Sequence, residues 1–343
     1  MQYVAVDGYG GDNAPFEIVR GVKQALESVK ELFVYLTGYR EELKKLIADF
    51  PKELLERLEI VDSKEVVKMS EKPSNALRLK DSSMAVGIRL VKEKKADAFV
   101  TAGNSGAAMA LAMFKLGRIK GVSRPAIATL LPTLSGHMLM LDVGANVDCK
   151  PQHLLEFSIM GAVYVKYVVG VPNPKIGVLS NGSEPGKGNQ VTIASYELLH
   201  KSKLNFIGNI EGDEIYRGKA DVVVCDGFIG NVVLKVSESI PDIIREFLKE
   251  EIKKSFWYKV GFLLAKPAFR VLKTKTDYSE FGGAPLLGVN GACIISHGRS
   301  NGEAIKNAIL KAIKFSREKV NDKIEKTLGS CTVLRQLKGA VGQ

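Results

Sequence analysis

The stretch VVVCDGFIGN (Val222–Asn231) changes character between Cys225 and Asp226. Four apolar residues, typical of a strand buried on both faces, run directly into a carboxylate, two glycines and a carboxamide. This pattern predicts a central β-strand that ends in a polar, glycine-containing loop. We expect Cys225 to be buried and inert, and Asp226 and Asn231 to take part in chemistry.

The same pattern recurs along the chain, with helix-period segments between the apolar runs. This alternation is typical of an α/β fold in three α/β/α layers, in which helices cover a largely parallel sheet. Residues 1–343 are predicted to form a single catalytic domain, because no internal repeat or low-complexity linker divides them. We expect strands at Tyr3–Val6, Leu32–Thr37, Glu59–Val61, Ala98–Thr101, Ala126–Leu131, Met138–Leu141, Lys175–Leu179, Phe206–Ile207, Val222–Cys225 and Cys293–Ser296. We expect helices at Pro15–Ser28, Arg40–Asp49, Ser74–Lys94, Gln152–Val169, Thr192–Lys201 and Gly302–Val320.

The loops that follow these strands share a chemistry. DGYGGDN follows Val6, TAGNSG includes the end of the strand at Thr101, DVGANVD follows Leu141 and SNGSEPGKGN follows Leu179, in addition to DGFIGN. Ligands of open parallel sheets bind outside the carboxyl ends of the strands, so the five loops are expected to meet at one edge. Glycine permits close approach, and amide donors at helix N-termini favour an anion such as phosphate. The sequence therefore predicts a shared anion site, although any one of these loops could be an ordinary turn.

Two nucleotide-binding motifs fail in these loops. In DGYGGDN, Asn13 stands where the dinucleotide fingerprint requires a third glycine. In GSEPGKGN the spacing is too short for a P-loop, and Gly188 replaces the residue that would hold magnesium. Lys187 remains, on a glycine-flanked turn before a helix. It is either a phosphate or oxyanion contact or a solvated loop lysine.

Other chemical groups are scattered. Cys149 and His153 stand four residues apart near a helix start, which leaves open either a thiolate–imidazole pair or a small buried thiol. His297 follows ACIIS and is expected at the loop edge, in a structural or a binding role. No metal is predicted, because the cysteines and histidines lack ligand spacing. Carboxylates that cap a turn or orient amides are expected directly after three strands, at Asp7, Asp142 and Asp226.

The chain has 343 residues, 45% hydrophobic content and a formal net charge of +11. Such a charge favours an acidic partner. Nucleic acid is not expected, because interleaved aromatic residues and nucleic-acid motifs are missing. The widely spaced cysteines favour a reducing compartment, and MQYVAVDGYGG does not resemble a signal peptide. We therefore expect a cytoplasmic protein.

Residues 239–275 differ from the rest of the chain and are predicted to form a protruding amphipathic helical segment. The run FWYKVGFLLAKPAFRVLK holds the only tryptophan, and its lysines and arginine form one cationic stripe. A large apolar face beside such a stripe predicts reversible contact with an anionic membrane, at the inner face of the cell membrane. A dimer contact or core packing is the alternative, and Pro267 is expected to break or kink the helix. The residues expected at the membrane are Trp257, Lys259, Phe262, Leu263, Leu264 and Lys266.

Several long motifs, in order, resemble the bacterial acyl-ACP:phosphate acyltransferases of phospholipid synthesis. They run from AVDGYGGDNAP to FGGAPLLGVNGACIISHGRSN. Between these lie SNALRLKDSSMAVGIRLVKEKKADAFVTAGNSGAAMA, LDVGANVDCKPQHLLEFSIMG and FIGNIEGDEIYRGKADVVVCDGFIGNVVLK. Gly8-Tyr9 replaces the usual Ala-Met of the family, and SNGSEPGKGN also departs from its pattern, but both keep the glycine loop.

The resemblance implies transfer of a long acyl chain from acyl carrier protein to inorganic phosphate. The acyl phosphate would then serve a downstream glycerol-3-phosphate acyltransferase. The resemblance further implies a homodimer, no metal or redox cofactor, and a fold similar to phosphate acetyltransferases and isocitrate- or isopropylmalate-type dehydrogenases.

Phosphate can attack a thioester by itself, so neither a cysteine nor a serine nucleophile is required. Preoriented amide donors and a lysine suit the two tasks of holding phosphate and stabilising an oxyanion. Catalytic roles are predicted for Lys187, Asn231, Asp226 and Asp142. The residues predicted to bind phosphate or thioester are Asp7, Gly10, Gly11, Asn104, Ser105, Gly106, Asn146, Asn189, Gly230 and His297.

Two other interpretations stay open. A dehydrogenase of the isopropylmalate type would share the fold, but it needs clustered metal-binding aspartates and an arginine set that we do not find in the sequence. A non-enzymatic protein that binds a membrane or nucleic acid would use the basic surface, but it would leave the five glycine loops without a role.

Overall fold

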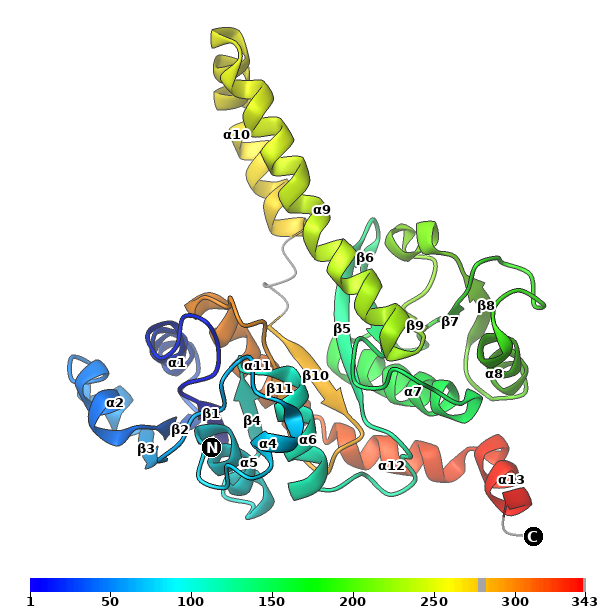
Figure 1. Cartoon of the computed structure of the whole chain (residues 1–343), viewed down its shortest axis with the longest axis horizontal. Helices are drawn as coiled ribbons and strands as arrows, with labels where there is room; N and C mark the ends of the chain where they lie inside the picture. Colours follow the sequence, from blue (N-terminus) through cyan, green and yellow to red (C-terminus); the bar gives the residue numbers. More distant parts are fainter. Residues whose placement is uncertain (277–281, 342–343) are drawn as a thin grey trace.

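The computed structural model describes residues 1–276 and 282–341. Within these ranges, eleven strands form one sheet in the order β3-β2-β1-β4-β11-β10-β5-β6-β9-β7-β8 (Figure 1). The strands are β1 (Gln2–Asp7), β2 (Leu32–Gly38), β3 (Leu58–Asp62), β4 (Ala98–Thr101), β5 (Ala126–Thr133), β6 (Gly136–Leu141), β7 (Ile176–Leu179), β8 (Phe206–Ile210), β9 (Val222–Val224), β10 (Ala284–Leu287) and β11 (Ala292–Ile295).

Helices connect the strands and cover the sheet. They are α1 (Phe16–Ser28), α2 (Arg40–Leu46), α3 (Lys52–Leu55), α4 (Pro73–Ala76), α5 (Ser83–Lys92), α6 (Ser105–Lys115), α7 (Pro151–Tyr164), α8 (Gln190–His200), α9 (Gly227–Lys253), α10 (Phe256–Thr276), α11 (Gly302–Arg317), α12 (Val320–Ser330) and α13 (Thr332–Val341). A π-helical turn follows α7 at Val165–Val169, and a 3-10 turn lies at Gly212–Arg217.

The hydrophobic core lies on both faces of the sheet. On β1, Val4 and Val6 belong to one buried cluster, whereas Ala5 between them belongs to the other. Successive side chains of a strand point to opposite faces, so this division shows that both faces are covered. The first cluster includes residues of α1, α7, α11 and α12, and the second includes residues of α5 and α6. The predicted α/β fold with a large, largely parallel sheet is confirmed.

The strand directions correct one expectation. β1, β2, β3, β4 and β11 are mutually parallel, and so are β6, β7, β8 and β9. Between the two groups, β10 is antiparallel to β11, β5 is antiparallel to β10, and β6 is antiparallel to β5. Three reversals make the two groups run in opposite directions. The loops after β1 and β4 therefore follow strands that run opposite to those before the other three loops, and the five do not share one edge. Four of the five segments nevertheless contribute to one pocket on the sheet face, through Asp12, Ser105, Val143 and Asn231.

Helix α9 links these two edges. It begins directly after β9, so Gly227–Asn231 is helical and not the loop that the sequence predicted. The helix then passes along the sheet face, where Leu234 packs against the buried cluster, toward the loop that follows β11 (Figure 1). With 27 residues it is about 40 Å long, which is long enough to continue beyond the sheet.

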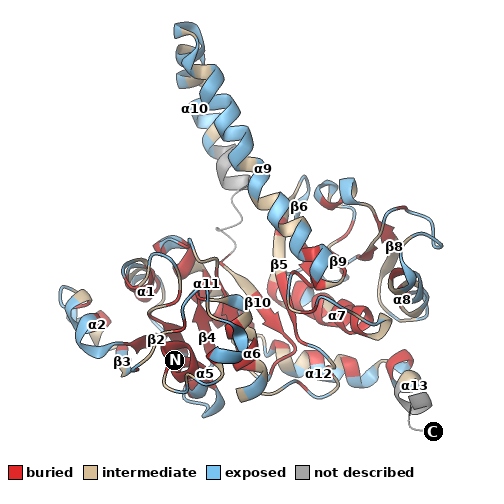
Figure 2. Cartoon of the chain, in the orientation of Figure 1, coloured by how far each residue is buried: buried red, intermediate tan, exposed pale blue. Residues whose placement is uncertain are grey.

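The distal half of α9 and helix α10 form an arm that projects from the body of the molecule (Figures 1 and 2). The arm is largely exposed, with Trp257 at 76% and Leu264 at 79% relative exposure. Helix α10 is continuous through Pro267, so of the expected break or kink the break does not occur, and the interruption lies between Lys253 and Phe256. Among the described residues, no helix is both long and apolar enough to cross a membrane.

Replacement of Gly230 tests how closely α9 must approach the sheet. A Cβ atom at this position would lie 1.9 Å from the carbonyl oxygen of Asp142 and 3.0 Å from Sγ of Cys225. Because neither can move without disturbing the sheet, Gly230→Ala should lower the free energy of unfolding by about 3 kcal/mol or more. Gly261→Ala is the matched control, since nothing lies within 4 Å there and alanine favours a helix by up to about 1 kcal/mol. Urea unfolding measures both, and equal stabilities of the two variants would contradict the prediction.

Candidate active site

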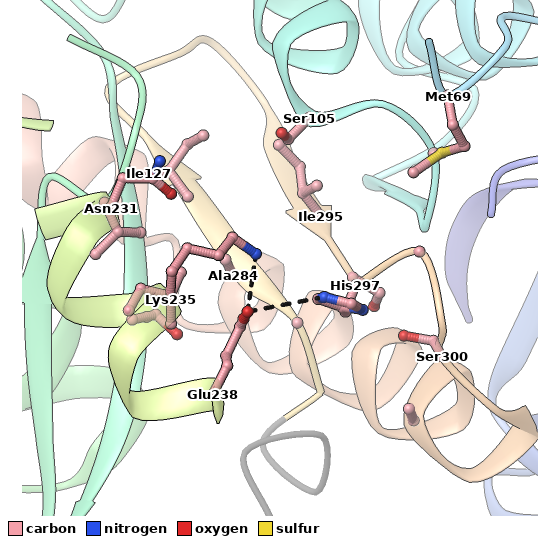
Figure 3. Close-up of a pocket in the computed structure, with 18 of the residues that line it drawn as sticks. Met69, Ser105, Ile127, Asn231, Lys235, Glu238, Ala284, Ile295, His297 and Ser300 are labelled. Atoms are coloured by element: carbon pink, nitrogen blue, oxygen red, sulfur yellow. Dashed lines mark hydrogen bonds and ion pairs between the residues drawn. The ribbon is translucent and has the colours of Figure 1, made fainter. Parts of the chain in front are cut away.

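A pocket of about 300 Å³ lies on the sheet face between the two strand groups (Figure 3). Strands β5, β10 and β11 form its floor, helix α9 forms one wall, and the loops after β4 and β11 form the other. Apolar and polar groups both contribute to its lining. The residues are Asp12, Met69, Gly103, Ser105, Ile127, Thr129, Val143, Asn231, Leu234, Lys235, Glu238, Gly283, Ala284, Ile295, Ser296, His297, Gly298, Ser300 and Ala304.

The loop after β4 is held by the buried carboxylate of Asp7. Oδ2 of Asp7 accepts a hydrogen bond from the Thr101 hydroxyl at 2.8 Å, and that hydroxyl accepts one from the Gly103 amide at 2.9 Å. Burial raises the pKa of Asp7, and hydrogen bonds from Ser83, Thr101 and the Tyr9 amide oppose this shift. Asp7 lies beneath the pocket wall and positions it.

The predicted glycines of the first loop lie against the same wall. A Cβ atom on Gly10 would come within 2.7 Å of the Gly103 amide, so this approach requires glycine. Gly11 has a φ of +113° and lies against Gly298, whose carbonyl oxygen accepts the Asp12 amide at 2.8 Å. The loops after β1, β4 and β11 are thereby joined at the rim of the pocket.

Asn104 begins helix α6 and holds a neighbouring segment. Its Oδ1 accepts the Ala107 amide at 3.0 Å, and its Nδ2 donates to the carbonyl oxygens of Met69 and Glu71, each at 2.8 Å. The side-chain amide is thus used within the protein, whereas Ser105, the next residue, lines the pocket. Gly106 follows in the first helical turn and lies next to Pro73.

The second wall is organised by Asp142, a fully buried carboxylate after β6. Its Oδ1 accepts the amides of Ile127, Gly144 and Ala145 at 3.0–3.3 Å. Its Oδ2 accepts the backbone amide of Asn146 at 2.6 Å and the side-chain amide of Asn146 at 2.8 Å. Burial raises the pKa of Asp142, and these hydrogen bonds oppose the shift. Asp142 was predicted to be catalytic, but its burial assigns it to positioning.

Asn146 connects this wall to the start of helix α9. Its carbonyl oxygen accepts the Gly227 amide at 2.7 Å, in the first turn of the helix. Asp226 is the N-cap residue, with its carboxylate accepting the Ile229 amide at 2.8 Å. Gly230 packs on Asp142, and Asn231 reaches the pocket next to Gly144 (Figure 3).

Three charged or titratable side chains meet at the far end of the pocket. Nζ of Lys235 donates to Oε2 of Glu238 at 2.8 Å, and Nε2 of His297 lies 3.9 Å from the same oxygen (Figure 3). His297 was predicted as a binding residue, but Lys235 and Glu238 were missed. Asn231, Lys235 and Glu238 lie at intervals of four and three residues, which places them on one helix face. This spacing could have identified them if the helix had been predicted from Gly227.

The comparisons with known proteins identify the family. The family model described as "Fatty acid synthesis protein" matches residues 2–323. A phosphate acyltransferase from Campylobacter jejuni subsp. doylei is 49% identical over 96% of this chain and 99% of its own length. A phosphate acyltransferase from Dictyoglomus turgidum is likewise 49% identical, over 96% of this chain and 98% of its own.

The chain belongs to the phosphate acyltransferase family. It is therefore an acyltransferase. Its fold is similar to that of a phosphotransacetylase from Streptococcus pyogenes, with a TM-score of 0.58, 18% identity, and coverage of 91% of this chain and 93% of the other. A phosphotransacetylase from Staphylococcus aureus gives a TM-score of 0.55 at 15% identity, over 92% of this chain and 94% of the other.

The cysteines of this acyltransferase do not have the environment of a nucleophile. Burial raises the pKa of the Cys149 thiol to about 12, so it is protonated at neutral pH. His153 does not activate it, because its Nδ1 accepts the Lys150 amide at 3.1 Å. Cys225 is buried, as expected, and burial raises its pKa well above the ordinary value. The alternative of a Cys149 nucleophile is therefore disfavoured.

Lys187 and Asn189 lie on the loop after β7, outside the residues that line the pocket. Both are exposed. Oδ1 of Asn189 accepts the Thr192 amide at 2.9 Å and caps α8, and the Lys187 amide donates to the Glu184 carbonyl oxygen. Strand β7 is the parallel neighbour of β9, so this loop lies beside the start of α9, but none of its residues lines the pocket. A catalytic role of Lys187 remains a prediction that the pocket does not support.

Replacing Asp142 by asparagine tests the organising role of this carboxylate. One amide N–H₂ group would then face backbone donors, so Asp142→Asn should lower the free energy of unfolding by about 2–3 kcal/mol. Asp226→Asn is the matched control, because asparagine caps a helix about as well as aspartate. Chemical denaturation of both variants measures the difference. A loss below about 0.5 kcal/mol for Asp142→Asn would show that the carboxylate does not hold this wall.

Proposed function

We propose that this protein transfers a long-chain fatty acyl group from acyl carrier protein to inorganic phosphate. The product, an acyl phosphate, would be consumed by a glycerol-3-phosphate acyltransferase in phospholipid synthesis. The names of its relatives support phosphate as the acceptor. The observation that carries the proposal is the pocket, which combines anion-binding groups with an apolar floor.

The anion-binding groups come from two helix N-termini and a lysine. Ser105 opens α6, Ser300 precedes the N-cap of α11, and both line the pocket beside Lys235. Helix N-termini carry a partial positive charge, which suits phosphate. At α11 two of the first amides are already used, because Gly302 donates to Glu17 and Ala304 to Asn301, so Ser105 and the start of α6 contribute more. A phosphate oxygen would attack the thioester carbon directly, and the C–S bond would break with its electron pair on sulfur. This reaction needs no protein nucleophile.

The apolar floor suits the acyl end of the donor. Ile127, Ala284 and Ile295 lie on adjacent central strands, with Val143 and Leu234 beside them. Each methylene removed from water there would contribute about 0.8 kcal/mol to binding. The carbonyl carbon of a thioester positioned between this floor and the helix N-termini would be within reach of a bound phosphate. The net charge of +11 favours an acidic protein as carrier of the acyl group.

The donor and acceptor are tested together by thiol release from long-chain acyl carrier protein. We expect free thiol to appear only when inorganic phosphate is present, because phosphate is the nucleophile. Sulfate at equal ionic strength is the control, since it matches the shape of phosphate but is a far weaker nucleophile. Release at the same rate with sulfate or without anion would mean hydrolysis. No release with correctly folded protein would defeat the proposed donor or acceptor.

The arm is proposed to serve as a contact surface. Its exposed apolar residues divide between the two helices. Along α9, Val236, Ile240, Ile243 and Phe247 lie on the side of the helix away from Lys235 and Glu238, and we propose that a second copy of the chain covers them in a homodimer. On α10, exposed Trp257, Leu263 and Leu264 lie near Lys259 and Lys266, and Phe262 packs against Phe269. This composition favours an anionic membrane surface at the inner face of the cell membrane.

Charge placed on the apolar side of α10 tests the membrane proposal. The double variant Leu263→Glu, Leu264→Glu should reduce sedimentation with anionic phospholipid vesicles at least tenfold, because both side chains lose apolar burial and gain repulsion. Leu134→Glu is the matched control, since Leu134 is an exposed leucine in the β5–β6 turn, outside the arm. Vesicle binding that falls equally in the control, or is unchanged in the double variant, would argue against this surface.

A further inference from the structure

His297 has a fixed tautomer at the rim of the pocket. Its Nδ1 accepts the backbone amide of Arg299 at 3.1 Å. A ring nitrogen that accepts a hydrogen bond cannot carry its own proton, so the proton of the neutral imidazole is on Nε2. In the neutral ring Nε2 is therefore the donor.

The Glu238 carboxylate faces both Nε2 of His297 and Nζ of Lys235. Its Oε2 accepts Nζ of Lys235 at 2.8 Å and lies 3.9 Å from Nε2 of His297, which is longer than a hydrogen bond (Figure 3). The Glu238 side chain is only 14% exposed, so its charge is poorly screened by solvent. It attracts the N–H group of the ring from one side and fixes Nζ of Lys235 from the other.

We propose that His297 donates its Nε2–H to the oxyanion that forms on the thioester carbonyl, and that Glu238 positions both His297 and the phosphate-binding Lys235. This inference rests on the proposed function. A phosphate oxygen forms a bond to the acyl carbon, the carbonyl electrons move to oxygen, and the C–S bond then breaks with its pair on sulfur. His297 stabilises the oxygen while it is negative and keeps its proton throughout. It does not act as a base, because its Nε2 already carries a proton.

A pair of amide variants locates the donor on the ring. Glutamine places its amide nitrogen near the position of Nε2, whereas asparagine places it near Nδ1. Loss of one oxyanion donor lowers kcat by about 10²–10³-fold in other acyl-transfer sites. We therefore expect the kcat of His297→Ala and of His297→Asn to fall by about this factor. The kcat of His297→Gln should be at least tenfold higher than that of His297→Asn. The KM for phosphate should stay within about twofold of the wild-type value in all three variants. Thiol release from acyl carrier protein is the readout, and His200→Gln on α8, outside the pocket, is the control.

The variant Glu238→Gln distinguishes a positioning role of Glu238 from a role in stabilising the fold. We expect kcat to fall about tenfold and the KM for phosphate to rise about fivefold, because both His297 and Lys235 lose their common partner. A merely structural role would lower the melting temperature and leave both constants of the folded fraction unchanged, which would overturn the assignment of Glu238.

Three outcomes overturn the role of His297. One is equal activity of His297→Asn and His297→Gln. Another is unchanged kcat with a raised KM for phosphate in His297→Ala, which would make His297 a phosphate ligand. A third is full activity of His297→Ala. The His297 side chain is 34% exposed, so the variants should fold. If the alanine variant does not fold, the comparison of His297→Asn with His297→Gln still tests the role of Nε2. Failure of the wild-type protein to release thiol would overturn the proposed function instead.

Discussion

The architecture of the pocket depends on one buried carboxylate that is surrounded by amide donors. Asp142 takes hydrogen bonds from β5, from the loop after β6 and from the side chain of Asn146. A buried charge without such partners would cost several kcal/mol, so the surrounding chain can adopt few other conformations. The carbonyl oxygen of Asn146 then receives the Gly227 amide. The direction in which α9 leaves the sheet, and with it the position of Asn231, Lys235 and Glu238, follows from this contact.

A second buried carboxylate does the same on the other side of the pocket. Asp7, through the hydroxyl of Thr101, fixes the amide of Gly103, and the neighbouring loops close on Gly10, Gly11 and Gly298. The two carboxylates belong to strand groups that run in opposite directions. Each holds one wall, and neither lines the pocket itself. Both aspartates therefore arrange backbone donors, whereas Ser105 and Lys235 line the pocket itself.

The fold was largely predictable from the sequence, and four of the five polar segments do contribute to one pocket, whereas their arrangement around it was not predictable. Apolar runs such as Ala98–Thr101 are bounded by glycine and polar residues, and this pattern located ten strands of the described chain. The strand Ala284–Leu287 was missed, because it is short and contains Pro285. This omission concealed the antiparallel pairings that reverse the direction of the sheet. The loop of Lys187 and that of Ser105 consequently looked like neighbours, although sequence patterns record no strand order. Lys235 and Glu238 were missed for a different reason, since their role depends on where α9 crosses the sheet.

Helix α9 combines two faces that have different requirements. Lys235 and Glu238 lie toward the pocket, and the exposed Val236, Ile240, Ile243 and Phe247 lie on the other side. Contiguous exposed apolar residues of this kind are costly in water and mark contact surfaces. Because both sets stand on one hydrogen-bonded helix, any surface that covers the apolar side also restrains the rotation and tilt of the polar side. A shift of about 1 Å in a group that contacts the reacting atoms can cost about 10²-fold in rate. A partner that covered the apolar side would therefore also fix the pocket wall, because both lie on a helix whose start is held by Asp142 through Asn146.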